Sequence, residues 1–203
     1  FIFFVSIAIQ SPQAAEIYRA TDEEVIDFLE KGLEDNWFGS YYDDGENKNN
    51  KNGYMSEEYK FILNSKQEEL FYSDINIYLS FVNYGAEEKY IISGKLIFQT
   101  SAPFNFIYEH FDLLTEDAFI NTSSQLTNSQ LNYSENINGE TTEKSTANIE
   151  YTLNDYFGLL AWIKNENLQI NDSVLVKEID SGNILLRQLT ILENKEKIIN
   201  GVI

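Results

Sequence analysis

Few residues of this chain could do covalent chemistry. Its 203 residues include no cysteine and one histidine, His110. The absence of cysteine excludes a thiolate nucleophile, a cysteine zinc site and an iron–sulfur cluster within this sequence. A serine-type hydrolytic centre needs a histidine base between a hydroxyl group and a carboxylate, so it would have to be built around His110.

The surroundings of His110 favour a structural role. His110 is in phase with Phe104, Phe106 and Tyr108 along a predicted strand. This spacing places the ring among aromatic side chains rather than in a polar cleft. We therefore expect no serine or threonine hydroxyl at the ring, no catalytic residue and no cofactor in this chain.

The clustered acidic residues give weak signals for a metal or a glycosidase site. The loop that contains Asp43, Asp44, Glu46, Asn47 and Asn49 offers oxygen ligands but lacks the spacing of a calcium-binding loop, so we expect a solvated turn and no metal. The carboxylate pairs are Glu68/Glu69, Glu87/Glu88 and Glu109/Asp112. A glycosidase needs two carboxyl groups across a cleft, whereas adjacent strand residues point to opposite faces.

The charge of the chain limits its partners. Thirty-three acidic residues stand against 14 basic ones, which gives a formal net charge of -19. Such a surface repels phosphate backbones and anionic lipid headgroups, so we expect no nucleic-acid partner and no membrane insertion of the mature domain. The same charge keeps a protein rich in aromatic residues soluble.

Period-two patterns predict that most of the chain is β-structure. The expected strands are Trp37–Tyr42, Met55–Leu63, Ile75–Phe81, Tyr90–Phe98, Phe104–Leu114, Leu131–Ile137 and Ala147–Leu153, whereas 121–138 is rich in Ser, Thr and Asn and less defined. The 13 tyrosines and 14 phenylalanines also suit pleated surfaces. We predict a mainly β (α+β) fold, with one curved, antiparallel, meandering sheet of at least about six strands.

Two helices are expected to pack on this sheet. Thr21 and Glu24 form a capping box, and apolar residues at helical spacing continue the helix over 22–35. A second, short helix is predicted over 154–164. The turn signal Asp180–Asn183 predicts a hairpin between strands 173–179 and 184–193, and 197–203 begins a further strand.

The N-terminal residues resemble a truncated export signal. Phe1–Ile9 is apolar and uncharged, and Gln10–Ala15 is polar and small, so we expect 1–15 to be a signal-peptide-like leader that packs on nothing. The alternative is a buried first strand. Residues 16–203 are expected to form a single β-rich domain that continues, or is followed by a further domain, beyond residue 203. We expect the protein to be exported and either periplasmic or anchored in the membrane facing the periplasm.

A short motif resembles a known bacterial domain. Trp37, Phe38, Gly39 and Tyr41, followed after a loop by Gly53-Tyr54, resemble the W-[YF]-G-x-Y-x-x-G-x-K-x-G-Y opening of an extracytoplasmic domain that precedes transglutaminase-like domains in exported or membrane proteins. Tyr156–Trp162 and Leu168–Ser173 are similar to its later "L-L-x-W" and "G-D-x" segments, with Asn171 in place of glycine. The resemblance implies an accessory domain, structural roles for the motif residues, and Cys-His-Asp chemistry on a downstream domain.

These sequence features leave three classes of function open. The preferred one is a non-catalytic interaction or scaffold domain whose partner is its own downstream domain or an envelope protein. The second is a periplasmic carrier of an apolar ligand such as a lipid. An autonomous hydrolase is the third. An open apolar cavity favours the carrier, and a sheet face filled by the protein's own helices favours the interaction module.

Overall fold

The computed structural model describes residues 2–6, 17–31, 36–42, 50–83, 86–164, 168–169 and 172–195, with the backbone alone for 2–6, 36–42, 50–52, 81–83, 86–87 and 190–195. The chain forms two compact units. One comprises Phe1–Asp27, Tyr151–Asp180 and Ile184–Ile203, and the other comprises Phe28–Glu150 and Ser181–Asn183.

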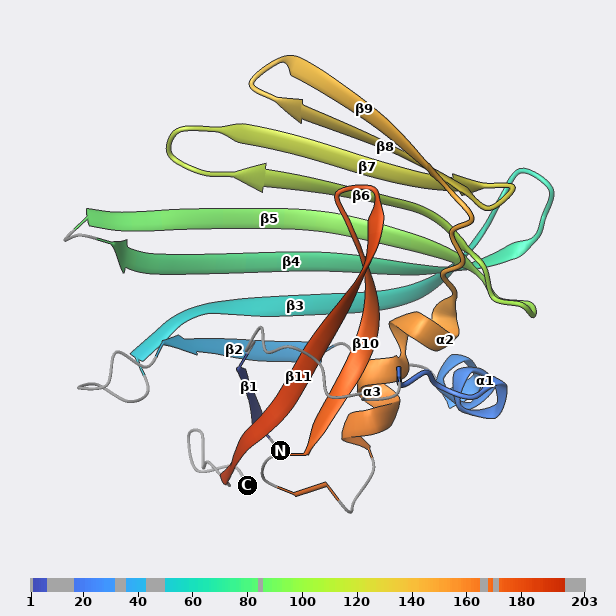
Figure 1. Ribbon diagram of the computed structural model, residues 1–203, viewed down its shortest axis with the longest axis horizontal. Coiled ribbons are helices and arrows are strands. Elements are labelled where there is room, and N and C mark those ends of the chain that lie inside the picture. The colour runs from blue at the N-terminus through green and yellow to red at the C-terminus, as the bar shows by residue number, and fades with distance from the viewer. Residues whose placement is uncertain are drawn as a thin grey trace. The chain divides into compact units, whose positions relative to one another are not determined.

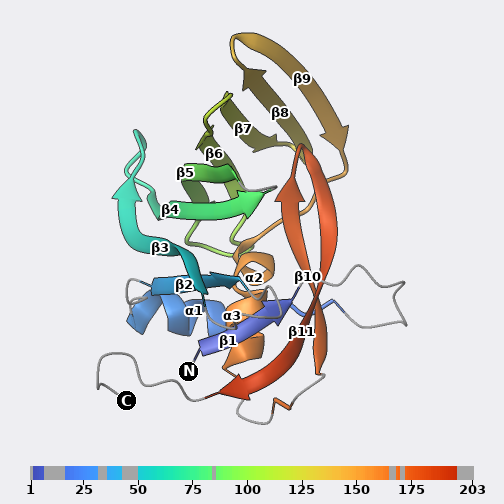
Figure 2. The same ribbon diagram turned by 90° about the vertical axis from the view of Figure 1, so that its left-hand side faces the viewer.

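An antiparallel sheet of eight strands makes up most of the second unit (Figure 1). The strands are β2 (Asn36–Tyr42), β3 (Asn50–Leu63), β4 (Glu69–Asn83), β5 (Ala86–Gln99), β6 (Phe106–Leu114), β7 (Phe119–Thr127), β8 (Gln130–Ile137) and β9 (Glu140–Ala147). Each strand pairs with the next along the chain, so the sheet is a meander. Figure 2 shows its curvature from β3 to β9. The predicted mainly β fold with a meandering antiparallel sheet is confirmed.

The two faces of this sheet differ in chemistry because side chains alternate along each strand. Phe71, Phe98 and Leu131 are buried on one face, which we call the apolar face. The opposite face, here the polar face, carries Lys95 and His110, which are paired across β5 and β6. On the apolar face, the Phe71 and Phe98 rings lie 6.3 Å apart, and the Phe98 and Phe106 rings 5.4 Å apart.

Two strands of this large sheet were not predicted, and one predicted strand is absent. β7 falls in the segment rich in Ser, Thr and Asn, and β9 has the sequence ETTEKSTA. Neither strand alternates between apolar and polar residues. Nearly all side chains of β9 are exposed, so it has no buried face that would require such an alternation. The prediction of a strand over Ala147–Leu153 is wrong, because the strand ends at Ala147 and a helix begins at Leu153.

The first unit contains a smaller sheet and two short helices. Its sheet has the order β1–β11–β10, where β1 is Ile2–Ser6, β10 is Ser173–Asp180 and β11 is Asn183–Lys195. The predicted hairpin around Asp180–Asn183 is therefore confirmed. Trp162, Val174, Val176 and Leu189 form a buried cluster in this unit.

The first helix follows its predicted capping box, and the prediction of the second helix needs a correction. In α1 (Asp22–Lys31), whose last residues belong to the second unit, the amide of Thr21 donates to Glu24 Oε2 at 2.7 Å and the amide of Glu24 donates to Thr21 Oγ1 at 3.2 Å, as the capping box predicts. The helix predicted over 154–164 is instead two helices, α2 (Leu153–Tyr156) and α3 (Gly158–Ile163). They meet at Phe157, which has φ -82 and ψ -1.

The N-terminal segment pairs with another strand. Ile2–Ser6 forms strand β1, which lies antiparallel to β11 with Ile2 opposite Lys195 and Ser6 opposite Thr190. This backbone pairing differs from the expected leader that packs on nothing. The burial of these side chains, which the alternative of a buried first strand requires, lies outside the described residues. The predicted strand over 197–203 and the oxygen-rich loop 43–49 lie outside the described residues.

Candidate functional site

The polar face carries the only histidine of the sequence in a hydrogen-bonded group. The Asn121 side-chain amide donates to Asp112 Oδ1 at 2.7 Å and approaches His110 Nε2 at 3.2 Å. Asp112 Oδ2 lies 3.4 Å from the same ring nitrogen. The Tyr108 ring stacks on the His110 ring at 6.4 Å, and the Lys95 ammonium group lies 5.6 Å from the centre of the Tyr108 ring.

This arrangement differs from a catalytic triad. A triad needs a hydroxyl on one ring nitrogen and a carboxylate on the other, whereas here the amide and the carboxylate both approach Nε2. Ser123 is the cross-strand partner of His110, yet in the described part of the chain no hydrogen bond joins a hydroxyl to the ring. The group connects neighbouring residues of β6 and β7, which stabilises their pairing. Glu109, the other carboxylate near His110, is buried on the opposite face from Asp112.

Two tyrosines of the sheet have perturbed acidity. Burial and the nearby Asp74 carboxylate raise the pKa of Tyr72, although Lys60, 4.5 Å from the ring centre, acts in the other direction. The hydroxyl of Tyr90 donates to Glu88 Oε2 at 2.8 Å, and this hydrogen bond raises the pKa of Tyr90 because it requires the protonated phenol.

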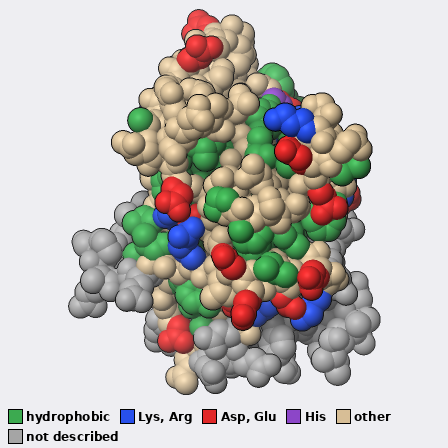
Figure 3. All heavy atoms as spheres, turned by 90° about the vertical axis from the view of Figure 1, so that its right-hand side faces the viewer, with side chains coloured by type: hydrophobic (Ala, Val, Ile, Leu, Met, Phe, Trp, Pro, Cys, Tyr) green, Lys and Arg blue, Asp and Glu red, His purple; other side chains and the backbone are tan. Residues whose placement is uncertain are grey.

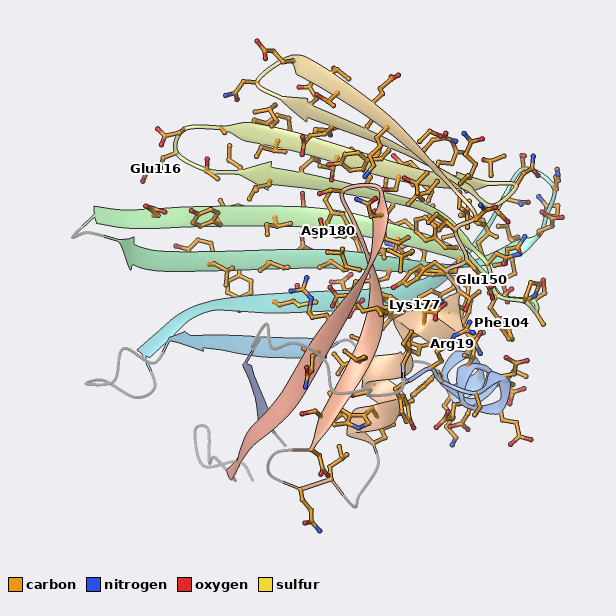
Figure 4. All side chains as sticks on the ribbon, in the orientation of Figure 1. Arg19, Phe104, Glu116, Glu150, Lys177 and Asp180 are labelled. Atoms are coloured by element: carbon orange, nitrogen blue, oxygen red, sulfur yellow. The ribbon has the colours of Figure 1, made fainter. Side chains whose placement is uncertain are left out.

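The first unit contains a buried carboxylate, Asp155, with two cationic partners. The Asp155 side chain has no exposed surface, and its Oδ1 lies 2.7 Å from Arg19 Nε and 3.4 Å from Lys177 Nζ. The backbone amide of Thr152 donates to Asp155 Oδ2 at 3.0 Å. Figure 4 labels Arg19 and Lys177. These contacts join the segment before α1, the start of α2 and strand β10, so we assign them a structural role.

The motif residues come together on the first hairpin of the large sheet. Trp37, Phe38, Gly39 and Tyr41 lie on β2, and Gly53 and Tyr54 lie on β3. Gly39 is directly opposite Tyr54, and Ser40 is opposite Gly53. A Cβ atom at Gly53 would lie 2.0 Å from the carbonyl oxygen of Tyr78, so this position requires glycine. The side chains of β2 are outside the described part.

One end of the polar face carries an apolar row that starts at the motif residue Tyr54. The register aligns one residue from each of β3 to β7 across the sheet: Tyr54, Tyr78, Ile91, Leu114 and Phe119. Four of these side chains are 41–48% exposed, and Tyr78 is half-buried. The Tyr54 and Tyr78 rings stack at 5.8 Å. We call these five residues the outer row.

The neighbouring residues form a second row on the apolar face. It consists of Met55, Ile77, Ile92, Leu113, Ile120 and Ile137, which the register aligns from β3 to β8. Ile137 is 41% exposed and the others are half-buried, unlike the fully buried Phe71 and Phe98 of the same face. We call these six residues the aliphatic row.

Sequence reasoning did not identify these rows because they depend on the register between strands. The strand alternation gives the face of each residue, but the alignment of Ile91 with Leu114 follows from the length and geometry of each hairpin turn. Figure 3 shows one face of the molecule, where hydrophobic side chains are interspersed with acidic ones. Amino-acid composition contains no information on register, so it gives no sign of a continuous row.

Comparisons with known proteins identify no relative. No protein family, curated protein or solved structure matches the chain at a significant level. Among the residues that the structure describes, no group of three His, Asp or Glu side chains is arranged to hold a metal ion. No helix within those same residues is long and apolar enough to cross a membrane.

Proposed function

We propose that this chain is a non-catalytic interaction domain that binds a protein partner on the outer row. The observation that carries the proposal is the exposure of four apolar side chains in one cross-strand line on the polar face. Isolated apolar residues are common on protein surfaces, but a contiguous apolar patch on a soluble domain marks an interaction site. The row includes the stacked pair Tyr54 and Tyr78, and aromatic residues are enriched in protein interfaces.

The acidic turn at one end of the outer row favours a basic partner. Glu116 and Asp117 are exposed in the turn that joins β6 to β7, beside Leu114 and Phe119 at the end of the row (Figure 4). A partner that places apolar side chains on the row and basic groups at its rim would therefore be attracted. In keeping with the motif resemblance, we propose an exported protein whose partner is a downstream domain or another envelope protein.

The aliphatic row supports a second candidate, the carrier of an apolar ligand. Six aliphatic side chains in line on the apolar face, none of them fully buried, offer a surface that an acyl chain could cover. The two candidates use opposite faces of the same strands. Neighbouring residues therefore provide matched variants, such as Leu114 for the interaction domain and Leu113 for the carrier.

Site-specific photo-crosslinking in the cell tests the preferred function. A photoreactive phenylalanine analogue at Leu114 should capture a discrete protein, and Ile91→Ser in the same chain should reduce that product. The same analogue at Leu113 is the matched control and should give little product. Equal products from both positions, or none from Leu114, would contradict the proposal.

Binding of the neutral fluorescent probe N-phenyl-1-naphthylamine tests the second candidate. A carrier should enhance the fluorescence of the probe, and Ile92→Ser should reduce the enhancement more than its neighbour Ile91→Ser. If the two variants behave alike, or the wild-type chain does not enhance the fluorescence, the carrier function is wrong.

A further inference from the structure

Strand β9 is an open edge of the large sheet. It pairs with β8 through eight consecutive residue pairs without a bulge, and none of the described strands pairs with its other side. Seven of its eight side chains are exposed, and Thr146 is half-buried. In the described part of the chain, no backbone hydrogen bond reaches β9 from its free side.

The turn before β9 determines which backbone groups are free. Asn138 and Gly139 form a two-residue turn with φ angles of 50° and 98°, and Ile137 is paired with Glu140. Residues that flank such a turn bond to each other, so the N–H and C=O groups of Glu140 point to β8. By alternation, the free groups are those of Thr141, Glu143, Ser145 and Ala147.

The charges of β9 restrict how it can pair with a second copy of itself. A two-fold axis normal to the sheet keeps each face continuous, so opposite residues share a face and the register must be centred on one residue. Registers centred on Glu140, Glu143 or Lys144 bring like charges together. A register centred on Thr142 instead places Glu140 opposite Lys144 of the second copy, and it does so twice. The remaining registers oppose each charge with a neutral residue or leave it unpaired.

We propose that two copies of this chain associate through antiparallel pairing of their β9 strands, centred on Thr142. Thr141 of each copy then exchanges backbone hydrogen bonds with Glu143 of the other. Glu140–Lys144 and Thr142–Thr142 become non-hydrogen-bonded pairs, in which side chains approach most closely. Opposite charges and paired threonines are both favourable cross-strand neighbours. This interface is separate from the outer row and does not depend on the function proposed above.

Several features make this association weak. Five residue pairs form a small interface, and two molecules that each carry a charge of -19 repel one another. Lys144 Nζ also lies 3.5 Å from the carbonyl oxygen of Ser181, but an ammonium group has three donors and can keep this contact. We expect a dissociation constant of about 10 to 1,000 µM.

Sedimentation equilibrium of the 203-residue chain between about 10 µM and 1 mM tests the proposal, with the fold of each variant checked by circular dichroism. The wild-type chain should form a dimer with rising concentration. Glu140→Lys and Lys144→Glu each place like charges in contact, so each should weaken the dimer at least about tenfold. The double variant restores the unlike pairs with the charges reversed and should dimerise as the wild type does.

Mixing the two single variants gives a stricter test, because both Glu140–Lys144 contacts become complementary again in the mixed dimer. An equimolar mixture should therefore associate although each variant alone does not. The control Glu116→Lys changes the net charge as Glu140→Lys does, but at an exposed turn, and should not weaken association. A chain that stays monomeric to about 1 mM, or single variants that fail to complement each other, would overturn the proposal.

Discussion

Asp155 shows how one residue can hold together segments that are distant in the sequence. Arg19 and Lys177 approach the same carboxylate oxygen, and neither the charge nor the spacing of these residues reveals the contact in the sequence. A charge with no exposed surface is tolerated because it has cationic partners and accepts from the backbone amide of Thr152.

Asp155→Asn should therefore destabilise the protein. The substitution leaves Arg19 and Lys177 without a counter-charge, although both retain some exposure to water, so we expect a loss of about 2 to 4 kcal/mol in the free energy of unfolding. Denaturant titration followed by circular dichroism measures the loss. Glu150→Gln, at an exposed position labelled in Figure 4, should change stability by less than about 0.5 kcal/mol. Equal effects of the two substitutions would refute the structural role of Asp155.

Tyr90 offers a test of local electrostatics by pH titration. Its pKa is raised because the phenol proton is hydrogen-bonded to Glu88, so the folded state holds this proton more tightly than the unfolded state does. The contribution to stability is complete below the ordinary tyrosine pKa of about 10 and is lost as pH rises through the higher value. In Glu88→Gln, the NMR signal of the labelled Tyr90 ring should titrate at lower pH. The signal of Tyr72, which interacts with Asp74, should not move.

At the scale of elements, the sequence predicts strands best where one face is buried. β4 and β5 alternate clearly because Phe71, Ile75 and Phe98 face the core while their neighbours do not. β9 could not be predicted in this way because its side chains are exposed on both faces. The break between α2 and α3 was also missed, since both flanks of Phe157 have apolar helical spacing. The outer row was missed for a different reason, because register arises from hairpin geometry.

The pairing of β5 with β6 depends on Gly94. This residue is directly opposite Phe111, and a Cβ atom at Gly94 would lie 2.1 Å from the Phe111 ring. Gly94→Ala must displace the ring, so it should destabilise the protein by about 1 to 3 kcal/mol in thermal or denaturant unfolding. Adding Phe111→Leu should make the same alanine less costly because the ring is gone. If Gly94→Ala costs as much with leucine at 111 as with phenylalanine, steric conflict with the ring is not the cause.

At the scale of the whole molecule, the net charge affects both the stability of the folded state and the association of two copies. A formal net charge of -19 over 203 residues opposes the compact state through self-repulsion, because few basic residues are available to compensate. Among the described residues, the contacts of Asp155 with Arg19 and Lys177 are the clearest case in which basic groups compensate a buried charge. The pairing of two negatively charged copies at β9 is subject to the same repulsion.

Salt should therefore stabilise this protein. Raising NaCl from about 0.01 to 0.15 M shortens the screening length from about 30 to about 8 Å, which weakens repulsion among distant carboxylates more than attraction within close pairs such as Arg19–Asp155. We expect the midpoint of thermal unfolding, measured by circular dichroism at a fixed low protein concentration, to rise over this range. Sucrose at matched osmolality is the control for effects that do not arise from screening. A midpoint that falls with NaCl would mean that favourable ion pairs outweigh the net repulsion, and the acidic composition would then have to be explained by local pairing rather than by solubility alone.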